Sequence, residues 1–194
     1  TVFPVSDLKD YLESIMVRKE SFLAEHYVGE LVRTSDGKLK WRLNNDKFPV
    51  YKTGRGGKFT YHGPGQRVVY LMLNLKELYN GQPDIKKFVS QLEDWLILTL
   101  KDIGLTAYRI PEHIGIWVKS KYGDERKIAA IGIRVKKWVS YHGIALNVNP
   151  NIDHYSGIVP CGILDKGVTS IWQEGIEIDI NDIDKLLIKN FEAI

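Results

Sequence analysis

The order of apolar and polar residues along the chain predicts three helices. In "PDIKKFVSQLEDWLILTLKDIG" the apolar residues recur every three to four positions, so they share one face of a helix. Asp84 is placed to cap the start of this helix, and Gly104 is placed to end it. The same spacing predicts one helix from Ser6 onward and another from about Asn181 onward.

Short runs rich in β-branched and aromatic residues predict strands. "RVVYLMLNL" is almost continuously apolar, which is typical of a buried strand, and "FPVYKT" predicts a short strand before it. Four further runs follow the central helix, with the turn "KYGDER" among them, whereas "TSDGKLKWRLNNDKF" gives no clear pattern. A long helix after a buried strand, followed by hairpins, predicts an α/β (α+β) domain with a mixed β-sheet flanked by helices. The four runs are "LTAYRI", "GIWVKS", "RKIAAIGIRVKKW" and "YHGIALNVNP".

The bulk composition is that of an ordinary globular protein. The 194 residues are 44% hydrophobic and 26% charged, and we expect one domain over 1–194. The longest apolar run, "DWLILTLKDIG", is too short and too charged to cross a bilayer, and no secretory signal is visible. A single cysteine rules out an internal disulfide and favours a reducing compartment, so we expect a cytoplasmic protein without a membrane partner.

The segment "RGGKFTYHGPGQ" holds four glycines among polar side chains, which favours a loop shaped around a ligand. It is not a phosphate loop, because Phe59 follows Gly57 and Lys58, and it lacks the spacing of a dinucleotide fingerprint. The five histidines show no i, i+4 pair and there is one cysteine, so we expect no metal. No G-x-S-x-G sequence is present, which excludes a serine hydrolase of that type.

A thiol is the nucleophile that remains. Cys161 lies in "GIVPCGI", where Pro160 fixes the approach and Gly162 leaves the backbone N–H groups open. Taken alone, a lone cysteine in apolar surroundings is more often an inert core residue. A reactive thiol needs a cationic or basic neighbour that lowers its pKa, and Lys127 and His142 are both candidates.

Three segments, in this order, resemble the lipoyl(octanoyl) transferase family: "RGGKFTYHGPGQ", "KIAAIGIRVKKWVSYHGIALNV", and "GIVPCGI" followed by "VTS". The resemblance runs from Phe48 to the C-terminus. It implies the fold of biotin and lipoate protein ligases. Before the first motif the chain departs from the family, because Glu25 and His26 are followed by "YVGELVRT". Either the segment near 27–47 has diverged, or a stretch of it is absent.

The resemblance also implies the site residues. The acyl-thioester nucleophile falls on Cys161, and the lysine that activates it falls on Lys127. His142 stays open between a wall of the site and a core histidine, and the N–H of Gly162 is a candidate oxyanion donor together with the glycine loop. The implied substrate-binding residues are Arg55, Gly56, Gly57, Lys58, Phe59, Thr60, Tyr61, His62, Ala130, Ile131, Gly132, Gly143, Ile144 and Ala145.

The implied reaction moves an octanoyl group from octanoyl-acyl carrier protein to a lysine of a lipoyl domain, without ATP or another cofactor. The implied acceptors are the lipoyl domains of 2-oxoacid dehydrogenase subunits or the glycine cleavage H protein. One alternative is an ATP-dependent lipoate or biotin protein ligase of the same fold. The other is a basic nucleic-acid-binding module that would use "RVKKW" with Arg67 and Tyr70; scattered basic residues and a net charge of +3 argue against it.

Overall fold

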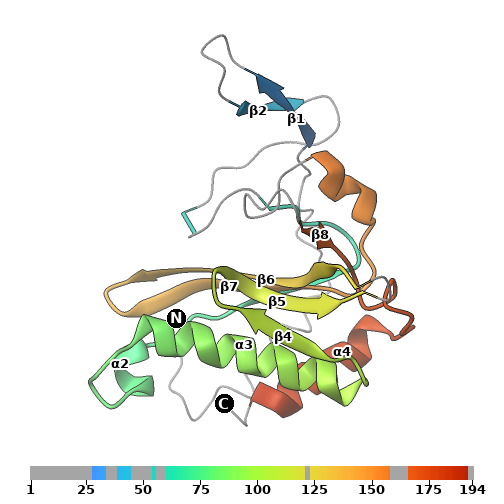
Figure 1. Ribbon diagram of the computed structural model, residues 1–194. Coiled ribbons are helices and arrows are strands. Elements are labelled where there is room, and N and C mark those ends of the chain that lie inside the picture. The colour runs from blue at the N-terminus through green and yellow to red at the C-terminus, as the bar shows by residue number, and fades with distance from the viewer. Residues whose placement is uncertain are drawn as a thin grey trace.

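The computed structural model describes residues 28–33, 39–44, 54–55, 60–120, 123–157 and 166–191, and for 28–33, 39–44 and 156–157 it describes the backbone only. The central feature is a six-stranded sheet (Figure 1). The two-residue strand β8 (Gly167–Val168) pairs in parallel with β6, so the sheet is mixed, as predicted. The other strands run antiparallel to their neighbours in the order β3 (Gln66–Tyr70), β7 (Val139–Asn147), β6 (Glu125–Lys136), β5 (His113–Lys119) and β4 (Ala107–Ile110).

Helices cover one face of this sheet. In Figure 1, α3 and α4 lie below the sheet, whereas the 3₁₀ helix η2 lies above it. Two more strands form a separate antiparallel pair. The long helices therefore cover one face of the sheet. The remaining elements are β1 (Val28–Arg33), β2 (Leu39–Asn44), α2 (Leu75–Leu78), α3 (Ile85–Asp102), η2 (Ile152–Gly157) and α4 (Ile180–Phe191).

The helix α3 begins and ends where the sequence predicts. The Asp84 carboxylate accepts hydrogen bonds from the backbone N–H groups of Lys86 and Lys87 at 2.8 and 3.0 Å, which satisfies donors at the helix start. Gly104 follows with a φ of +83°, the left-handed conformation in which a helix commonly ends. The apolar face of α3 then packs on the sheet.

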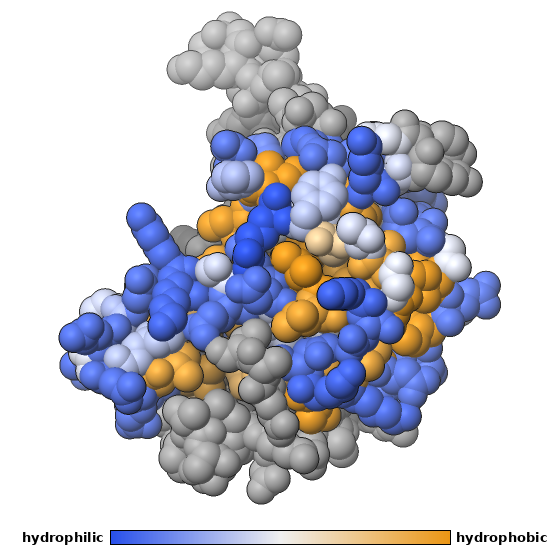
Figure 2. Space-filling model, turned by 60° about the horizontal axis from the view of Figure 1, so that its bottom comes forward, coloured by the Kyte–Doolittle hydropathy of each residue, from blue (hydrophilic) through white to orange (hydrophobic). Residues whose placement is uncertain are grey.

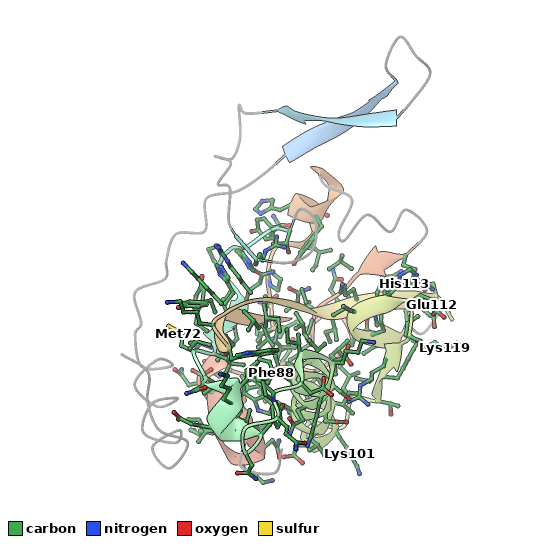
Figure 3. The ribbon with its side chains drawn as sticks, turned by 90° about the vertical axis from the view of Figure 1, so that its left-hand side faces the viewer. Met72, Phe88, Lys101, Glu112, His113 and Lys119 are labelled. Atoms are coloured by element: carbon green, nitrogen blue, oxygen red, sulfur yellow. The ribbon has the colours of Figure 1, made fainter. Side chains whose placement is uncertain are left out.

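The core lies between the sheet and the two long helices. Phe88 lies on the side of α3 that faces the sheet, while the exposed Lys101 points away from it (Figure 3). Trp95 is fully buried, its Nε1 donates to the Leu187 carbonyl of α4 at 2.7 Å, and its ring packs edge-on against Phe191. One aromatic side chain thus joins both helices to the core.

The predicted strands and the last helix are confirmed, with two differences. β3 ends at Tyr70, although Leu71 still donates to the His142 carbonyl at 2.7 Å, so the pairing continues past the strand. The polar stretch without a clear pattern contains β2, which pairs with β1. The alternating apolar and polar residues of "LKWRLN" are a strand pattern that was overlooked. The predicted helix from Ser6 and the strand in "FPVYKT" lie outside the described residues.

The surface over the helices is mixed in character. Figure 2 brings this side of the molecule forward and shows hydrophilic residues with smaller apolar areas among them. Ile85 and Trp172 are exposed apolar side chains, each at 41%. Within the described part of the chain, no helix is both long enough and apolar enough to cross a membrane.

Two tryptophans offer a matched test of the core. Trp95 and Trp172 each donate an indole N–H to a backbone carbonyl, but Trp95 is 0% exposed and Trp172 is 41% exposed. We expect Trp95→Phe to lower the free energy of unfolding by about 2 kcal/mol, because it leaves a cavity and removes a buried hydrogen bond. Trp172→Phe should change it by less than about 0.5 kcal/mol. Urea denaturation measures both, and equal losses would contradict this account of the core.

Candidate active site

Part of the predicted site lies within the described residues. The described part of the chain includes Lys127, His142 and several of the substrate-binding positions. The remaining predicted site residues lie outside the described residues: Gly56, Gly57, Lys58, Phe59, Cys161 and Gly162.

A break in the pairing of β5 and β6 decides where the Lys127 side chain lies. Ile116 pairs with Ala129, but Trp117 pairs with Lys127, so β6 has one extra residue, Ile128, at this point. Such a β-bulge interrupts the alternation of side chains between the two faces of a sheet. Ile128 and Ala129 therefore both belong to the core under the sheet, while Lys127 lies on the opposite face.

The ammonium group of Lys127 is buried and hydrogen bonded. The residue is 5% exposed, and its Nζ donates to the Ile114 carbonyl at 2.7 Å. β8 runs directly beside it, because Val168 is the register partner of Lys127 and the Thr169 N–H donates to the Lys127 carbonyl at 3.0 Å. Lys127 is thus not a solvated lysine at a strand start.

Small residues line the same face of the sheet further along β6 and β7. Ala130 pairs directly with Ala145, and Gly132 pairs directly with Gly143. A Cβ at Gly143 would clash with the Val69 carbonyl oxygen, so the close approach of β3 and β7 requires glycine there. Paired residues share a face, so these positions form a smooth floor.

Two of the predicted substrate-binding residues point the other way. Ile131 pairs with Ile144, and both pack in or against the core between the sheet and the helices. Side chains alternate along a strand, so these residues lie on the face opposite Ala130 and Gly132. The motif "AIG" therefore contributes only its outer residues to the floor.

The end of the glycine loop is tied to η2. Tyr61 is fully buried, and its hydroxyl shares a 2.8 Å hydrogen bond with Nδ1 of His154. Its ring also packs edge-on against Tyr155, with the ring centres 5.2 Å apart. Burial raises the pKa of the Tyr61 hydroxyl, so this group stays protonated. A Cβ at Gly63 would clash with the Tyr61 hydroxyl, which explains the glycine at this position.

Gln66 connects the glycine loop to β7. Its Nε2 donates to Asn147 Oδ1 at 2.8 Å and to the Tyr155 hydroxyl at 2.6 Å. Its Oε1 accepts from the Gly63 N–H at 3.2 Å and lies 3.2 Å from His62 Nδ1. A buried network of this kind fixes the loop relative to the sheet.

Positive charges gather around two histidines beside the loop. Burial lowers the pKa of His62, and the charges of Arg55 and His142 lower it further, against the opposing effect of the Gln66 hydrogen bond. Burial also lowers the pKa of His142, together with the charges of Arg55 and Arg134. The partly exposed imidazole of His142 thus lies near Arg55 of the glycine loop and Arg134 of β6.

The segment "VTS" packs into this framework. Thr169 and Ser170 are 0% and 1% exposed, and the Thr169 carbonyl accepts from Asn147 Nδ2 at 2.9 Å. Thr169 Oγ1 donates to Glu174 Oε1 at 2.5 Å. The chain that follows the Cys161 segment is therefore anchored to β6 and β7.

Several residues that organise the site were not selected from the sequence. Gln66 and Asn147 stand inside the quoted motifs, so the motifs carried a signal for them. His154, Tyr155 and Trp117 stand outside the motifs, and only their contacts in the fold reveal them. Among the residues that the structure describes, no three His, Cys, Asp or Glu side chains are grouped as a metal site would require.

Comparison with known proteins identifies the family. The lipoyl protein ligase A/B catalytic domain matches residues 38–192. The chain belongs to this family. The match includes the bulge of β6, the small-residue floor and "VTS".

Relatives in this family are named octanoyltransferases. One from Wolbachia pipientis subsp. Culex pipiens is 53% identical over 76% of this chain and 70% of the relative. One from Bartonella quintana is 46% identical over 96% of this chain and 79% of the relative, and one from Rickettsia peacockii is 43% identical over 96% and 90%. The expected family and the expected enzyme class, an octanoyltransferase, are confirmed at this level.

Solved structures confirm the expected fold. A bipartite lipoate protein ligase from Thermoplasma acidophilum aligns with a TM-score of 0.55 and 20% identity over 72% of this chain. A biotin protein ligase from Aquifex aeolicus, in complex with biotin and ATP, aligns with a TM-score of 0.51 and 17% identity over 68% of this chain. The chain spans 55% and 50% of those two structures, respectively. At these identities they show the fold alone, that of biotin and lipoate protein ligases.

The charge arrangement around His142 is testable by titration. Because Arg134 contributes to the lowered pKa of His142, we expect Arg134→Gln to raise that pKa. NMR titration of the His142 ring protons measures the shift, and Lys101→Gln on the far side of α3 is the matched loss of charge. An equal shift in both variants would contradict the arrangement.

The same two histidines predict how stability depends on pH. The folded state disfavours protonation of His62 and His142, because their pKa values are lowered. Their contribution to the free energy of unfolding is therefore present above the ordinary pKa of about 6.5 and is lost as the pH falls below it.

Proposed function

We propose that the chain transfers an octanoyl group from a thioester donor to a lysine of a lipoyl domain through a thioester on Cys161. The observation that carries the proposal is the placement of Lys127 on the face of the sheet away from the helices, next to β8. β8 begins six residues after Cys161, so the chain that bears the thiol leads directly to the register partner of Lys127. The octanoyltransferase relatives support the acyl group and the reaction class.

Lys127 is a better partner for the thiol than His142. His142 pairs with Ile133 of β6, six residues beyond Lys127. At a rise of about 3.3 Å per residue the two positions are about 20 Å apart along the strand. A thiol beside one of them is therefore not beside the other, and β8 runs alongside Lys127.

The first half-reaction is a thioester exchange. The Cys161 thiolate attacks the carbonyl carbon of the donor thioester and forms a new S–C bond. The S–C bond of the donor breaks, and the donor leaves as a thiol with a proton from the Lys127 ammonium, which becomes a neutral amine. The ammonium of Lys127 stabilises the thiolate before attack. Backbone N–H groups of Gly162 or the glycine loop stabilise the oxyanion, an interaction worth about 3 kcal/mol. Because one thioester replaces another, no ATP is needed.

The second half-reaction forms an amide. The acceptor lysine has an ordinary pKa of about 10.4 and must lose a proton before it attacks the thioester carbonyl. The neutral Lys127 amine left by the first half-reaction accepts this proton and becomes an ammonium again, and Cys161 leaves as a thiolate. Formation of the amide makes the step favourable.

The small-residue floor supports the octanoyl chain. Ala130, Gly132 and Ala145 have small or no side chains, and Val68 pairs with Ala145 and so faces the same side. Each methylene that is buried there contributes about 0.8 kcal/mol. The preferred length of the acyl chain is set by how far this floor stays free of larger side chains.

The same proposal includes the donor, the acceptors, the extent of the catalytic domain and its location. The donor is octanoyl-acyl carrier protein, the acceptors are lipoyl domains of 2-oxoacid dehydrogenase subunits or the glycine cleavage H protein, and residues 1–194 act as one catalytic domain in the cytoplasm. The family resemblance supports the partners, and the single cysteine supports a reducing compartment.

The competing function is ATP-dependent ligation of lipoate or biotin. Ligases of this fold are known with ATP bound, such as lipoate-protein ligase A. Against it stand the thiol in "VPCGI" and a glycine loop without the phosphate-binding pattern. ATP dependence separates the two functions.

We expect octanoyl-acyl carrier protein to load one octanoyl group onto Cys161 without ATP, because thioester exchange is nearly balanced. Intact mass and peptide mapping locate the group, and Cys161→Ser is the control that removes the thiol. Transfer that proceeds with no adduct, or only after ATP is added, would contradict the proposal.

The floor makes a second prediction about acyl length. Ala130→Leu places a branched side chain on the floor, so we expect a loss of octanoyl transfer of about tenfold or more relative to butanoyl transfer. Ile131→Leu is the matched control, because its side chain packs on the core face. kcat/KM for donors of four, six and eight carbons measures the profile. Equal profiles for the two variants would move the acyl chain away from this floor.

A further inference from the structure

Trp117 packs directly on the ammonium of Lys127. The indole is 1% exposed, and Lys127 Nζ lies 5.3 Å from its ring centroid. The indole N–H donates to the His113 carbonyl at 2.9 Å, which fixes the plane of the ring. The neighbours Ile116 and Val118 pack in the core, so Trp117 alone of these three lies on the Lys127 face.

A glycine makes this packing sterically feasible. Gly115 has a φ of +121°, and a Cβ there would clash with Lys127 Cε and lie 2.7 Å from the Ala129 carbonyl. With glycine in place, the Ile114 carbonyl comes within 2.7 Å of Lys127 Nζ. The ammonium therefore has a carbonyl oxygen as one partner and an aromatic face as another.

We propose that Trp117 is a positioning residue for acyl transfer, which holds the Lys127 ammonium in one place and keeps it charged although it is buried. Burial of an ammonium favours the neutral amine, whereas a carbonyl acceptor and an aromatic face both favour the cation. The proposal rests on the proposed function for the use of this charge beside Cys161. What it adds to that function is Trp117, the group that maintains the charge on Lys127.

Other charged groups surround the same indole. Lys166 Nζ lies 5.9 Å from the ring centroid, and its ammonium pairs with the Glu125 carboxylate, which also accepts from the Tyr108 hydroxyl. The His113 ring lies 5.9 Å from the indole, and on the helix side Glu93 accepts from the Gly115 N–H at 3.4 Å. Because Lys127 Nζ lies closer to the ring centroid than Lys166 Nζ does, at 5.3 against 5.9 Å, the indole is assigned chiefly to Lys127.

The direct test observes the Lys127 side chain itself. In protein made with ¹³C-labelled lysine, the Lys127 signal is assigned by its loss in Lys127→Ala. Because Nζ lies over the indole face, we expect Trp117→Leu to move this signal toward those of the solvent-exposed lysines. Trp117→Phe keeps an aromatic face but loses the indole N–H, and it should retain more than half of the original displacement. Equal Lys127 signals in wild type and Trp117→Leu would overturn the proposal.

A second variant covers the case in which Trp117→Leu does not fold. Gly115→Ala pushes the Lys127 side chain off the Ile114 carbonyl and should also shift the Lys127 signal. Gly167→Ala is the matched control, because its added Cβ makes only ordinary contact with Arg126, at 3.5 Å or more. A Lys127 signal that is the same in Gly115→Ala and Gly167→Ala would overturn the packing of Lys127 between the Ile114 carbonyl and Trp117.

Thiol alkylation separates this proposal from the function it rests on. The rate of Cys161 alkylation against pH is measured in wild type, Lys127→Ala, Trp117→Leu and the double variant. We expect both single variants to raise the pH at which the alkylation rate is half-maximal. The double variant should match Lys127→Ala, because Trp117 acts through Lys127. Additive shifts would overturn the role of Trp117. No shift in Lys127→Ala would overturn the pairing of Lys127 with Cys161, and with it the use of the charge.

Discussion

The buried ammonium of Lys127 depends on the extra residue that β6 carries opposite Ile116 and Trp117. In a regular ladder, Lys127 and Ala130 would lie on opposite faces, because they are an odd number of residues apart. The bulge sends Ile128 and Ala129 into the core and leaves Lys127 on the face that also bears the small-residue floor. One irregularity of the backbone thus joins the charged group and the floor of the site.

The periodic parts of the fold were predictable from the sequence because their signal is local. α3 shows its apolar face, its Asp84 cap and its Gly104 end in consecutive residues, and β4 to β7 each show β-forming runs. The bulge was not predictable, since it depends on which residues of β5 face β6. The same reason explains why Ile131 and Ile144 were grouped with the floor: a motif is read continuously, whereas a strand divides it between two faces.

The site is fixed by contacts between segments that are distant in the sequence. Tyr61 of the glycine loop bonds to His154 of η2, and Gln66 joins the same loop to Asn147 of β7. β8 is held beside Lys127 by the Thr169 N–H. These bonds bring the end of the glycine loop (Tyr61 to Gln66), β7 and the "VTS" segment together, an arrangement that the proposed transfer requires.

If Lys127 is the cationic partner of the Cys161 thiol, the two side chains must lie in contact. A high-resolution crystal structure of the free enzyme gives the distance from Lys127 Nζ to Cys161 Sγ. We expect a separation of about 4 Å or less, the range in which an ammonium stabilises a thiolate. A separation of about 8 Å or more, or a thiol that lies beside His142 instead, would show that Lys127 is not this partner.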